Sequence, residues 1–541
     1  MAAPHRHQED ELDDNMPETL DADDALEEVA DVEGGMDIDS DDDGDNVDDR
    51  EEIILENDSI AYFDAHKGSI FAIAQHPTIP SLIATGGGEG DDEDAPGKGY
   101  VFDTSAAAGR PVLPPSYNAD PSNNGQPQTT ALTPLFALDG HTDSINALAF
   151  TLPRGEFLLS GGLDERLRVY AITVDAAHNS NNKKPSNARF VAESHEDGEV
   201  NWIAPCPAAS KYANTFAVGR SDGSVYVYGI ESSTANSNNP QEVSLTQLNV
   251  FSLHTKSCTA GAWTPDGELL ATVGEDSALY VWDVWGSASA LSKGGQTVVS
   301  LTAADHLFAV EDGLFSVAID PRGSLVAVGG GGGAIRIVGL PQLGGGTNSN
   351  HAVPGRSTQT AAQSNRPSKA KAKGVSGSTA QTDALRKPIT FGTGGVETLA
   401  FSPSQPLLAA GSTDGSFAVF ETVRAFDVRK LNPGAHGSKC VVRVDFVADA
   451  GDGWLLTTCG IDGVVRRWDT RGQAGAARSS GVAGTDAARL VKEWRGHSGA
   501  PDGDDEEDGE ASGGVLGFVQ GKTGERVVTA GDDGLALVFE A

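Results

Sequence analysis

The chain has 541 residues, a formal net charge of −40 and 66 glycines, a composition typical of a soluble protein with many tight turns. Its acidic N-terminus lacks the basic and apolar regions of a signal peptide, and no apolar run is long enough to span a bilayer. The four cysteines form no CxxC pair, which disfavours a zinc site and favours buried free thiols in a reducing compartment. We expect a cytoplasmic protein without membrane contact, and entry into the nucleus stays open.

The first segment, residues 1–58, holds 25 Asp and Glu against two Arg, a local balance of −23. Such a segment cannot bury enough apolar surface to fold, so we expect a disordered acidic arm. The remaining −17 lies on residues 59–541. An acidic body argues against a direct contact with nucleic acid and favours a basic partner.

Six aspartates are each followed, six residues later, by an aromatic residue that ends an alternating apolar stretch. Because Asp caps tight turns and Asp-Gly is a preferred hairpin apex, each unit predicts a strand, a turn and a second strand. The turn aspartates are Asp164, Asp222, Asp276, Asp414, Asp462 and Asp533. Their recurrence predicts a radial array of small sheets, in which these aspartates have a structural role.

Eight segments follow the same order of polar loop, strands A and B, turn, and strand C. They begin near His66, Gly140, His195, His254, Leu314, Val396, His436 and Gly496. The fifth has glycines in place of the turn Asp, and the eighth stops after strand C. Residues 59–63 can supply its missing outer strand, which would close a ring and cover an open edge. We therefore predict an all-β, eight-bladed β-propeller over residues 59–541.

Three insertions interrupt the predicted blades. Residues 89–94 lie between strands B and C of the first blade and residues 501–510 precede strand A of the eighth, and both are acidic. In a propeller these two kinds of connection leave the same face, conventionally the top, so that face is expected to be acidic. Residues 341–388 carry seven Lys and Arg against one Asp and predict a flexible linker on the opposite face. Its stretch Lys369–Lys373 would be a solvated loop, a contact for the acidic arm or a weak nuclear signal.

Motifs for catalysis are missing from the sequence. The run Gly329–Gly333 is not followed by Gly-Lys-Ser/Thr, and neither GxSxG nor HExxH occurs. The acidic runs lack the ligand order of an EF-hand loop. We therefore predict a binding protein and not an enzyme, with no metal and no cofactor.

One position near the start of each strand A is expected at the central opening of the ring. These positions are Phe71, Asn146, Asn201, Thr259, Phe315, Glu397, Val442 and Leu516. Two further carboxylates precede turn aspartates and are expected to face outward on the top rim. The predicted partner-binding residues are Glu397, Asp532, Glu275, Phe315, Asn146 and Asn201. Exposed carboxylates at one spot attract Lys and Arg of a partner, and ordinary surface charge is the alternative.

The Gly-His, Trp-Asp and Gly-x-x-Asp-Gly units resemble the WD-repeat propeller family. This resemblance implies that the His before strand A, the turn Asp and the aromatic of strand C form a hydrogen-bonding set within each blade. On that basis the turn aspartates hold the blades together and do not touch a partner.

Two stretches are similar to one group within that family. They are residues 59–66, which continue into Phe71-Ala-Ile-Ala-Gln-His-Pro and Thr85-Gly-Gly-Gly, and residues 527–540. With the Asp-rich arm they resemble WD-repeat chaperones dedicated to a large-subunit ribosomal protein of the universal L-sixteen class, and the related angio-associated migratory cell protein. The resemblance implies a protein that holds the basic N-terminal segment of the newly made ribosomal protein on its acidic top face, with acidic contacts at Glu397 and Asp532. We expect a monomer. A scaffold in signalling or ubiquitin ligation and an acidic histone chaperone remain alternatives.

Overall fold

The computed structural model describes residues 57–90, 95–107, 129–175, 184–195, 197–207, 211–232, 243–287, 296–341, 385–472, 487–499 and 513–541. Residues 55–541 form one compact unit. The predicted arm up to residue 56, the acidic stretches 91–94 and 501–510 and most of the 341–388 linker lie outside the described ranges. Within these ranges, no helix has the length and apolar character needed to cross a membrane.

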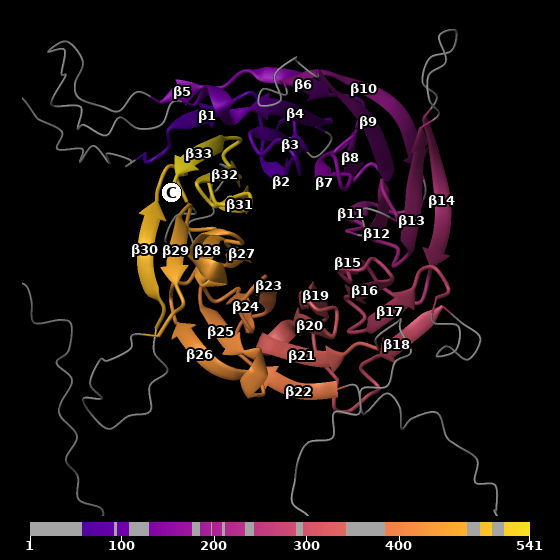
Figure 1. Ribbon diagram of the computed structural model, residues 1–541, viewed down its shortest axis with the longest axis vertical. Helices are drawn as coiled ribbons and strands as arrows, with labels where there is room; N and C mark the ends of the chain where they lie inside the picture. Colours follow the sequence, from indigo (N-terminus) through magenta and orange to yellow (C-terminus); the bar gives the residue numbers. More distant parts are fainter. Residues whose placement is uncertain are drawn as a thin grey trace, which may run out of the picture. The chain divides into compact units, whose positions relative to one another are not determined.

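The described residues form eight sheets, antiparallel except for one short edge pair, arranged as the blades of a ring (Figure 1). In blades 1 to 8 the innermost strand A is β2 (Ile70–Gln75), β7 (Ile145–Phe150), β11 (Val200–Pro205), β15 (Cys258–Trp263), β19 (Leu314–Ile319), β23 (Val396–Phe401), β27 (Val441–Phe446) and β31 (Val515–Val519). Strand B is β3 (Leu82–Gly88), β8 (Phe157–Gly162), β12 (Thr215–Arg220), β16 (Leu269–Gly274), β20 (Leu325–Gly330), β24 (Leu407–Ser412), β28 (Leu455–Gly460) and β32 (Arg526–Gly531).

The two outer strands of each blade continue the same meander. Strand C is β4 (Gly97–Asp103), β9 (Arg166–Asp175), β13 (Val225–Ser232), β17 (Leu279–Asp283), β21 (Ala334–Gly339), β25 (Phe417–Glu421), β29 (Val465–Asp469) and β33 (Ala536–Glu540). Strand D of blades 1 to 7 is β6 (Pro134–Leu138), β10 (Lys184–His195), β14 (Val243–Phe251), β18 (Thr297–Leu301), β22 (Leu385–Thr390), β26 (Asp427–Asn432) and β30 (Arg489–Trp494). Short 3-10 turns are η1 (Thr104–Ala106), η3 (Gly331–Gly333), η4 (Thr422–Arg424) and η5 (Ala450–Gly453). The eight-bladed prediction is confirmed, although residues 385–388 of the expected linker belong to β22.

The ring is closed by the strand that precedes the first blade. Strand β1 (Ala61–Phe63) pairs antiparallel with β33, as predicted for residues 59–63. A two-residue strand that the sequence did not suggest, β5 (Thr130–Ala131), pairs parallel with β1 on its outer edge. Leu132, which follows β5, is buried with Ile60 and Phe63. The closing strand is therefore covered on both edges.

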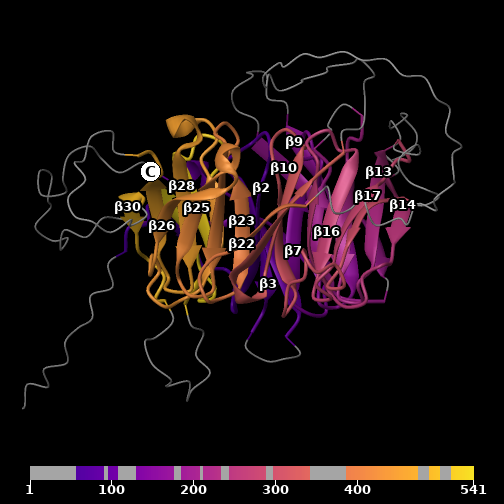
Figure 2. The same cartoon turned by 90° about the horizontal axis from the view of Figure 1, so that it is seen from below.

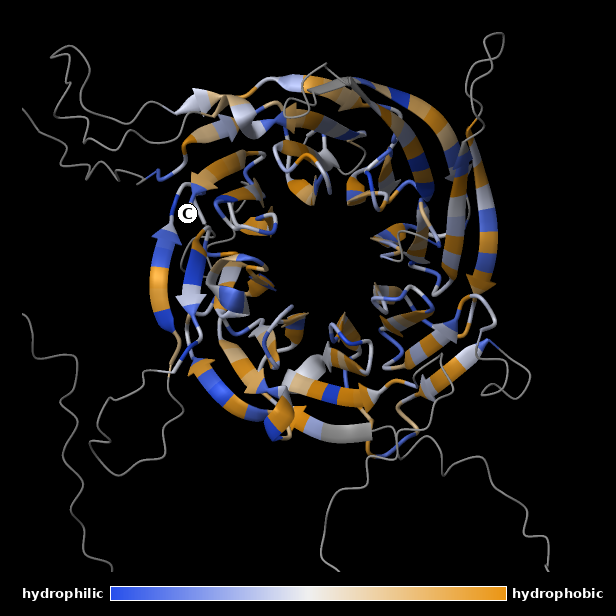
Figure 3. Cartoon of the chain, in the orientation of Figure 1, coloured by the Kyte–Doolittle hydropathy of each residue, from blue (hydrophilic) through white to orange (hydrophobic). Residues whose placement is uncertain are grey.

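Apolar packing between neighbouring blades holds the ring together. Strands B such as β16 and β24 are buried along their whole length, because each is sandwiched between the adjacent blades. One apolar cluster joins blades 4 and 5, and another joins blades 7 and 8. The outer strands mix hydrophobic and hydrophilic residues, which suits a half-exposed strand (Figure 3). The strands run between two faces, where the connections gather (Figure 2).

Candidate partner-binding face

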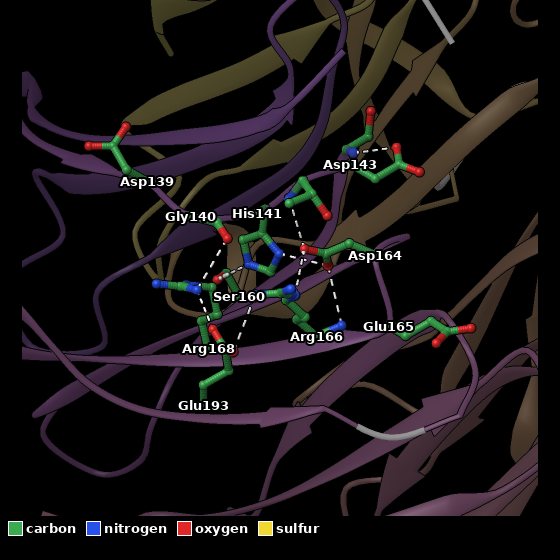
Figure 4. Close-up of polar contacts among 12 residues, drawn as sticks. Asp139, Gly140, His141, Asp143, Ser160, Asp164, Glu165, Arg166, Arg168 and Glu193 are labelled. Carbon is green, nitrogen blue, oxygen red and sulfur yellow. Dashed lines mark hydrogen bonds and ion pairs between the residues drawn. The ribbon is translucent and has the colours of Figure 1, made fainter. Parts of the chain in front are cut away.

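The turn aspartates lie within hydrogen-bonded sets, as the resemblance implied. In blade 2, His141 Nδ1 lies 2.9 Å from Asp164 Oδ1 and His141 Nε2 lies 2.7 Å from Ser160 Oγ (Figure 4). The Thr142 and Arg166 amides also donate to Asp164. Burial alone would raise the pKa of Asp164, but the hydrogen bonds and the charge of His141 outweigh it and hold that pKa below its usual value.

The same arrangement recurs in three further blades. The distances from the His Nδ1 to the carboxylate are 3.0 Å for His254–Asp276, 2.8 Å for His436–Asp462 and 2.9 Å for His497–Asp533. The strand C aromatic takes part in two of these blades: the Trp282 and Trp468 indoles each donate to the threonine hydroxyl that the histidine also contacts. These side chains fix the turns.

Blades 3 and 6 depart from the pattern. Asp222 and Asp414 accept a hydrogen bond from the amide of a serine two residues further on, and neither pairs with a histidine of the described ranges. The prediction that blade 3 begins at His195 is wrong. Strand β10 is twelve residues long and stays paired to its end, so His195 lies exposed on the outer strand of blade 2. The buried Arg220 side chain, which donates to the Gly198 carbonyl, fills this part of blade 3 instead.

The two faces of the ring differ in charge. We call the side formed by the D-to-A and B-to-C connections the acidic face, and the other side the opposite face. Over the described residues, the acidic face carries 18 Asp and Glu against 4 Lys and Arg, and the opposite face 7 against 6. The acidic residues are Asp64, Glu89, Asp139, Asp143, Asp164, Glu165, Asp197, Glu199, Asp222, Glu275, Asp276, Asp305, Glu311, Asp312, Asp414, Asp462, Asp532 and Asp533, against Lys67, Lys256, Lys439 and Arg495. The acidic residues of the opposite face are Glu156, Asp266, Glu268, Asp320, Asp449, Asp452 and Glu525, and its basic residues are Arg154, Lys211, Arg322, Arg424, Arg471 and Lys522. Acidity on one face therefore does not depend on the two acidic insertions alone.

A β-bulge positions one side chain per blade at the inner edge of the acidic face. In all eight described blades the register between strands A and B shifts around the second residue of strand A. These residues, which we call the inner ring, are Phe71, Asn146, Asn201, Thr259, Phe315, Glu397, Val442 and Leu516, the positions aligned from the sequence. A bulge leaves its extra residue out of the ladder and re-aims the side chain. The shared bulge explains why one alignment found all eight positions.

Two inner-ring residues are tied to the next blade. The Asn201 side-chain amide donates to Ser257 Oγ at 2.7 Å and to the Cys258 carbonyl at 3.0 Å. The Thr259 hydroxyl donates to the Leu314 carbonyl at 2.6 Å. Asn201 was predicted to bind a partner. Its side-chain amide instead donates hydrogen bonds from blade 3 to blade 4. Asn146 is half-buried in blade 2, and its role in binding stays a prediction.

Glu397 is the inner-ring carboxylate. Its side chain is solvent-accessible, and within the described ranges its carboxylate has no hydrogen bond and no ion pair. The surrounding blades nevertheless desolvate the carboxylate, and this burial raises its pKa. Burial raises the pKa of the Cys440 thiol, and the negative charge of Glu397 raises it further, to about 12. A carboxylate that is partly desolvated and unpaired gains most from a cation supplied by a partner.

Asp532 and Glu275 occupy equivalent places in blades 8 and 4 but differ in their surroundings. The expectation that Asp532 faces freely outward is wrong, because it is half-buried and accepts a 2.6 Å hydrogen bond from Ser69 Oγ of blade 1. Glu275 is exposed. Gly313 lies next to it, where Ser69 lies next to Asp532. Glu397 and Asp532 belong to the same face.

The structure brings three of the predicted residues into one neighbourhood. A Cβ added to Gly313 would lie 3.1 Å from Glu275 Cα and 3.5 Å from the Phe315 ring. The Ser316 hydroxyl donates to the Val396 carbonyl at 2.9 Å, so Phe315 and Glu397 each lie one residue from a bond between blades 5 and 6. Sequence reasoning placed Phe71 in the inner ring but missed it as a binding candidate. The structure leaves Phe71 44% exposed, which the sequence alone does not indicate.

Among the described residues, no group of three or more His, Cys, Asp or Glu side chains is arranged to hold a metal ion. Cys206, Cys258 and Cys459 are buried free thiols, whereas Cys440 is half-buried. The arrangement therefore offers fixed negative charge, two aromatic rings and a desolvated carboxylate. Such a set binds cations.

Comparison with known proteins identifies the family. Residues 132–171, 245–283 and 386–421 match the WD40 model, described as WD domain, G-beta repeat. Human Angio-associated migratory cell protein is 21% identical over 89% of this chain and 80% of its own length. Ribosome assembly protein SQT1 of Saccharomyces cerevisiae is 28% identical over 47% of this chain, and the match spans 48% of that relative. The crystal structure of Chaetomium thermophilum Sqt1 bound to the N-terminus of the ribosomal protein L10 is 47% identical, with a TM-score of 0.68 over 90% of this chain and 100% of that one. The chain therefore belongs to the Sqt1 family of WD40-repeat proteins.

Proposed function

We propose that this protein is a ribosome-assembly chaperone that binds the basic N-terminal segment of a newly made large-subunit ribosomal protein of the L10 type on its acidic face. The observation that carries the proposal is the charge difference between the faces, 18 acidic against 4 basic residues on one and 7 against 6 on the other within the described ranges. The solved complex of a 47% identical family member with such a segment supports the choice of partner.

Capture follows from electrostatics. A ribosomal protein exposes Lys and Arg that would bind RNA nonspecifically before assembly, and a concentrated negative field steers them to this face. Once bound, charge-assisted hydrogen bonds to carboxylates such as Glu397 hold the segment. Release occurs when ribosomal RNA offers a stronger polyanion. Sqt1-like assembly factors are a family without catalytic activity, and this account needs no cofactor.

The proposed partner also indicates the compartment in which this protein acts. Ribosomal proteins are bound as they are made, so we infer that the protein acts in the cytoplasm, as a monomer with one acidic face per chain. Escort into the nucleus would be an extension of the same role.

The test reverses the one unpaired inner-ring carboxylate. Glu397→Lys should weaken binding of a basic peptide from the N-terminus of L10 by ~100-fold in calorimetry, because a like charge at a desolvated site costs several kcal/mol. The matched controls are Asp449→Lys and Glu525→Lys, exposed carboxylates of the opposite face. They should change affinity by less than ~2-fold at physiological salt, where charges beyond a Debye length are screened. Equal losses in all three variants would contradict the proposal.

A further inference from the structure

The opposite face has a groove between blades 5 and 6, which are neighbours in the ring (Figure 1). The A-to-B turns of both blades and the C-to-D turn of blade 6 form it, and its volume is about 300 Å³. This volume, at the lower end for a binding pocket, suits side chains of a peptide. We call it the proline groove, and the lining residues used below are Pro321, Arg322, Phe401, Pro403, Pro406 and Val423.

The walls of the proline groove are fixed without a partner. On the blade 6 side, the Ser402 hydroxyl donates to the Gly453 carbonyl of blade 7 at 2.8 Å. On the blade 5 side, Asp320 accepts hydrogen bonds of 2.6 Å from the Ser324 and Leu325 amides of its own turn. The three prolines fix the backbone further and offer no N–H for pairing with a strand. A peptide would therefore be held through its side chains, at a small cost in ordering the groove.

Val423 is the most exposed large hydrophobic side chain of the described residues, at 72%. Its turn is anchored to the groove, because the Thr422 amide donates to the Pro406 carbonyl at 2.9 Å. The turn is also strained: Ala425 and Phe426 both have positive φ values, 54° and 58°, which are costly for residues other than glycine. Burial of Phe426 in the blade core holds this conformation. Such strain clusters at binding and other functional sites.

The charges at the proline groove leave one arginine available. The charged lining residues are Asp320 and Arg322. Asp320 is buried and engaged by the amides of its own turn, whereas the exposed Arg322 guanidinium has no hydrogen bond and no ion pair within the described ranges. Next to the groove, Glu421 pairs with both Arg424 and Arg429. This corner of the opposite face therefore favours a carboxylate from a partner.

The chain's own segments suit the groove less well than a partner does. The linker begins beside it, since the Leu340 amide donates to the Ser324 carbonyl at 2.8 Å. Residues 341–388, however, carry seven Lys and Arg against one Asp, the same sign as the groove. The acidic arm joins the ring on the acidic face, where the Asp58 amide donates to the Arg495 carbonyl at 2.8 Å. The charges and the chain path therefore favour a separate, acidic partner.

We propose that the proline groove docks a short acidic segment of a partner protein, which inserts a large apolar side chain beside Val423 and Phe401 and directs a carboxylate at Arg322. This site goes beyond the proposed function, because it lies on the other face of the ring. The six residues of β23 span about 20 Å between the faces. That distance is more than twice the Debye length of about 8 Å at 0.15 M salt. The two faces therefore bind their partners independently, a basic segment on one and an acidic segment on the other.

The experiment selects a random peptide library on the full-length protein after depletion on the Val423→Asp variant, which keeps the acidic face intact. Enriched sequences should carry a large apolar residue next to Asp or Glu. In calorimetry with the enriched peptide, Arg322→Glu should weaken binding by ~10-fold through charge reversal. Val423→Ala should weaken it by ~5-fold through loss of apolar contact. The matched controls are Lys522→Glu on the same face and Val491→Ala on the outer strand β30, which should change affinity by less than ~2-fold. Thermal unfolding checks that each variant is folded.

Selective loss in Arg322→Glu and Val423→Ala supports the docking site. No enrichment, enrichment of basic peptides, or equal affinity in these two variants and the controls overturns it. Displacement of the enriched peptide by a saturating basic L10 peptide also overturns it, because the faces would then share one site.

Two further outcomes would identify another occupant and overturn a separate partner. A wild-type dimer that Val423→Asp dissociates would identify a second copy of this chain. Peptide binding that tightens ten-fold on removal of residues 1–54 would identify the acidic arm. Failure of the wild-type protein to bind the L10 peptide, by contrast, overturns the proposed function and leaves the groove standing.

Discussion

The acidic and the opposite face of this ring are built from the same repeat, yet only one concentrates charge. Both consist of short connections between strands that share one meander. The A-to-B turn 402–406 is rich in Pro and Ser, whereas the B-to-C turns of blades 2, 4, 7 and 8 each hold an Asp that bonds a histidine. The same aspartates that stabilise the blades therefore contribute to the field that attracts a cation. Part of the negative charge that attracts the partner therefore belongs to residues that stabilise the fold.

The acidic face contains two kinds of carboxylate. Turn aspartates such as Asp164 are hydrogen-bonded, and their pKa values are lowered. Glu397 is unpaired, and its pKa is raised by burial. The first kind should determine stability and the second kind binding.

The largest effect on stability is expected from removing a turn carboxylate. Asp462 pairs with the buried His436 at 2.8 Å and with Arg466 at 2.6 Å. Asp462→Ala leaves the histidine without this partner and should lower the free energy of unfolding by about 2 kcal/mol in chemical denaturation. Peptide affinity of the folded variant should fall only by the loss of one charge, ~3-fold or less. A variant with full stability but no binding would reverse the roles assigned to the two kinds of carboxylate.

Lowering the pH should weaken binding before it unfolds the protein. The pKa of Glu397 is raised above its usual 4.5, so this carboxylate is protonated at a higher pH than ordinary ones and loses its attraction for a cation. The folded pKa values of Asp164, Asp276 and Asp462 lie below 3.8, and their stabilising effect is present above the unfolded pKa and lost as the pH falls through the folded values.

Calorimetry and thermal unfolding over the same pH series measure both effects. As Glu397 becomes protonated, peptide affinity should drop by ~10-fold, the factor that corresponds to one pKa unit. Over the same pH range the melting temperature should stay unchanged. Simultaneous loss of binding and structure would show that the two sets of carboxylates titrate together. In Glu397→Gln the early drop in affinity should be absent.

The smallest effect is expected from the acidic arm. Residues 55–541 form a compact unit by themselves and contain every group assigned to the binding face. Removing residues 1–54 should therefore change peptide affinity at 0.15 M salt by less than ~2-fold, since charges beyond about 8 Å are screened. A loss of affinity of ten-fold or more would place the binding site in the arm. That result would favour the alternative of an acidic histone chaperone.

The repeated part of this structure could be predicted from the sequence, and the contacts between blades could not. The spacing of Asp276 and Trp282 sets strand C within one blade, and the inner-ring positions follow because each strand A begins with the same bulge. The Ser69–Asp532 bond joins residues 463 apart, and no periodic pattern indicates it. Strand β5 was missed for the same reason, since it is short and pairs outside the meander.

The start of blade 3 was predicted wrongly for a local reason. His195 stands where a blade start was expected, but the strong pairing of the long β9–β10 hairpin draws it into the previous blade. Arg220, at the end of a strand where the other blades have Gly or Ser, was the residue that signalled the exception. The roles of six residues in binding stay predictions: Glu397, Asp532, Glu275, Phe315, Asn146 and Asn201.

Hydrogen exchange of the full-length protein, with and without a saturating basic peptide from L10, tests most directly which face binds. The account predicts slower exchange in the connections of the acidic face, in particular residues 311–316, 391–398 and 531–535. Exchange in residues 402–406 and 520–525 of the opposite face should stay unchanged. Protection confined to these opposite-face turns, with none near Glu397, would contradict the account.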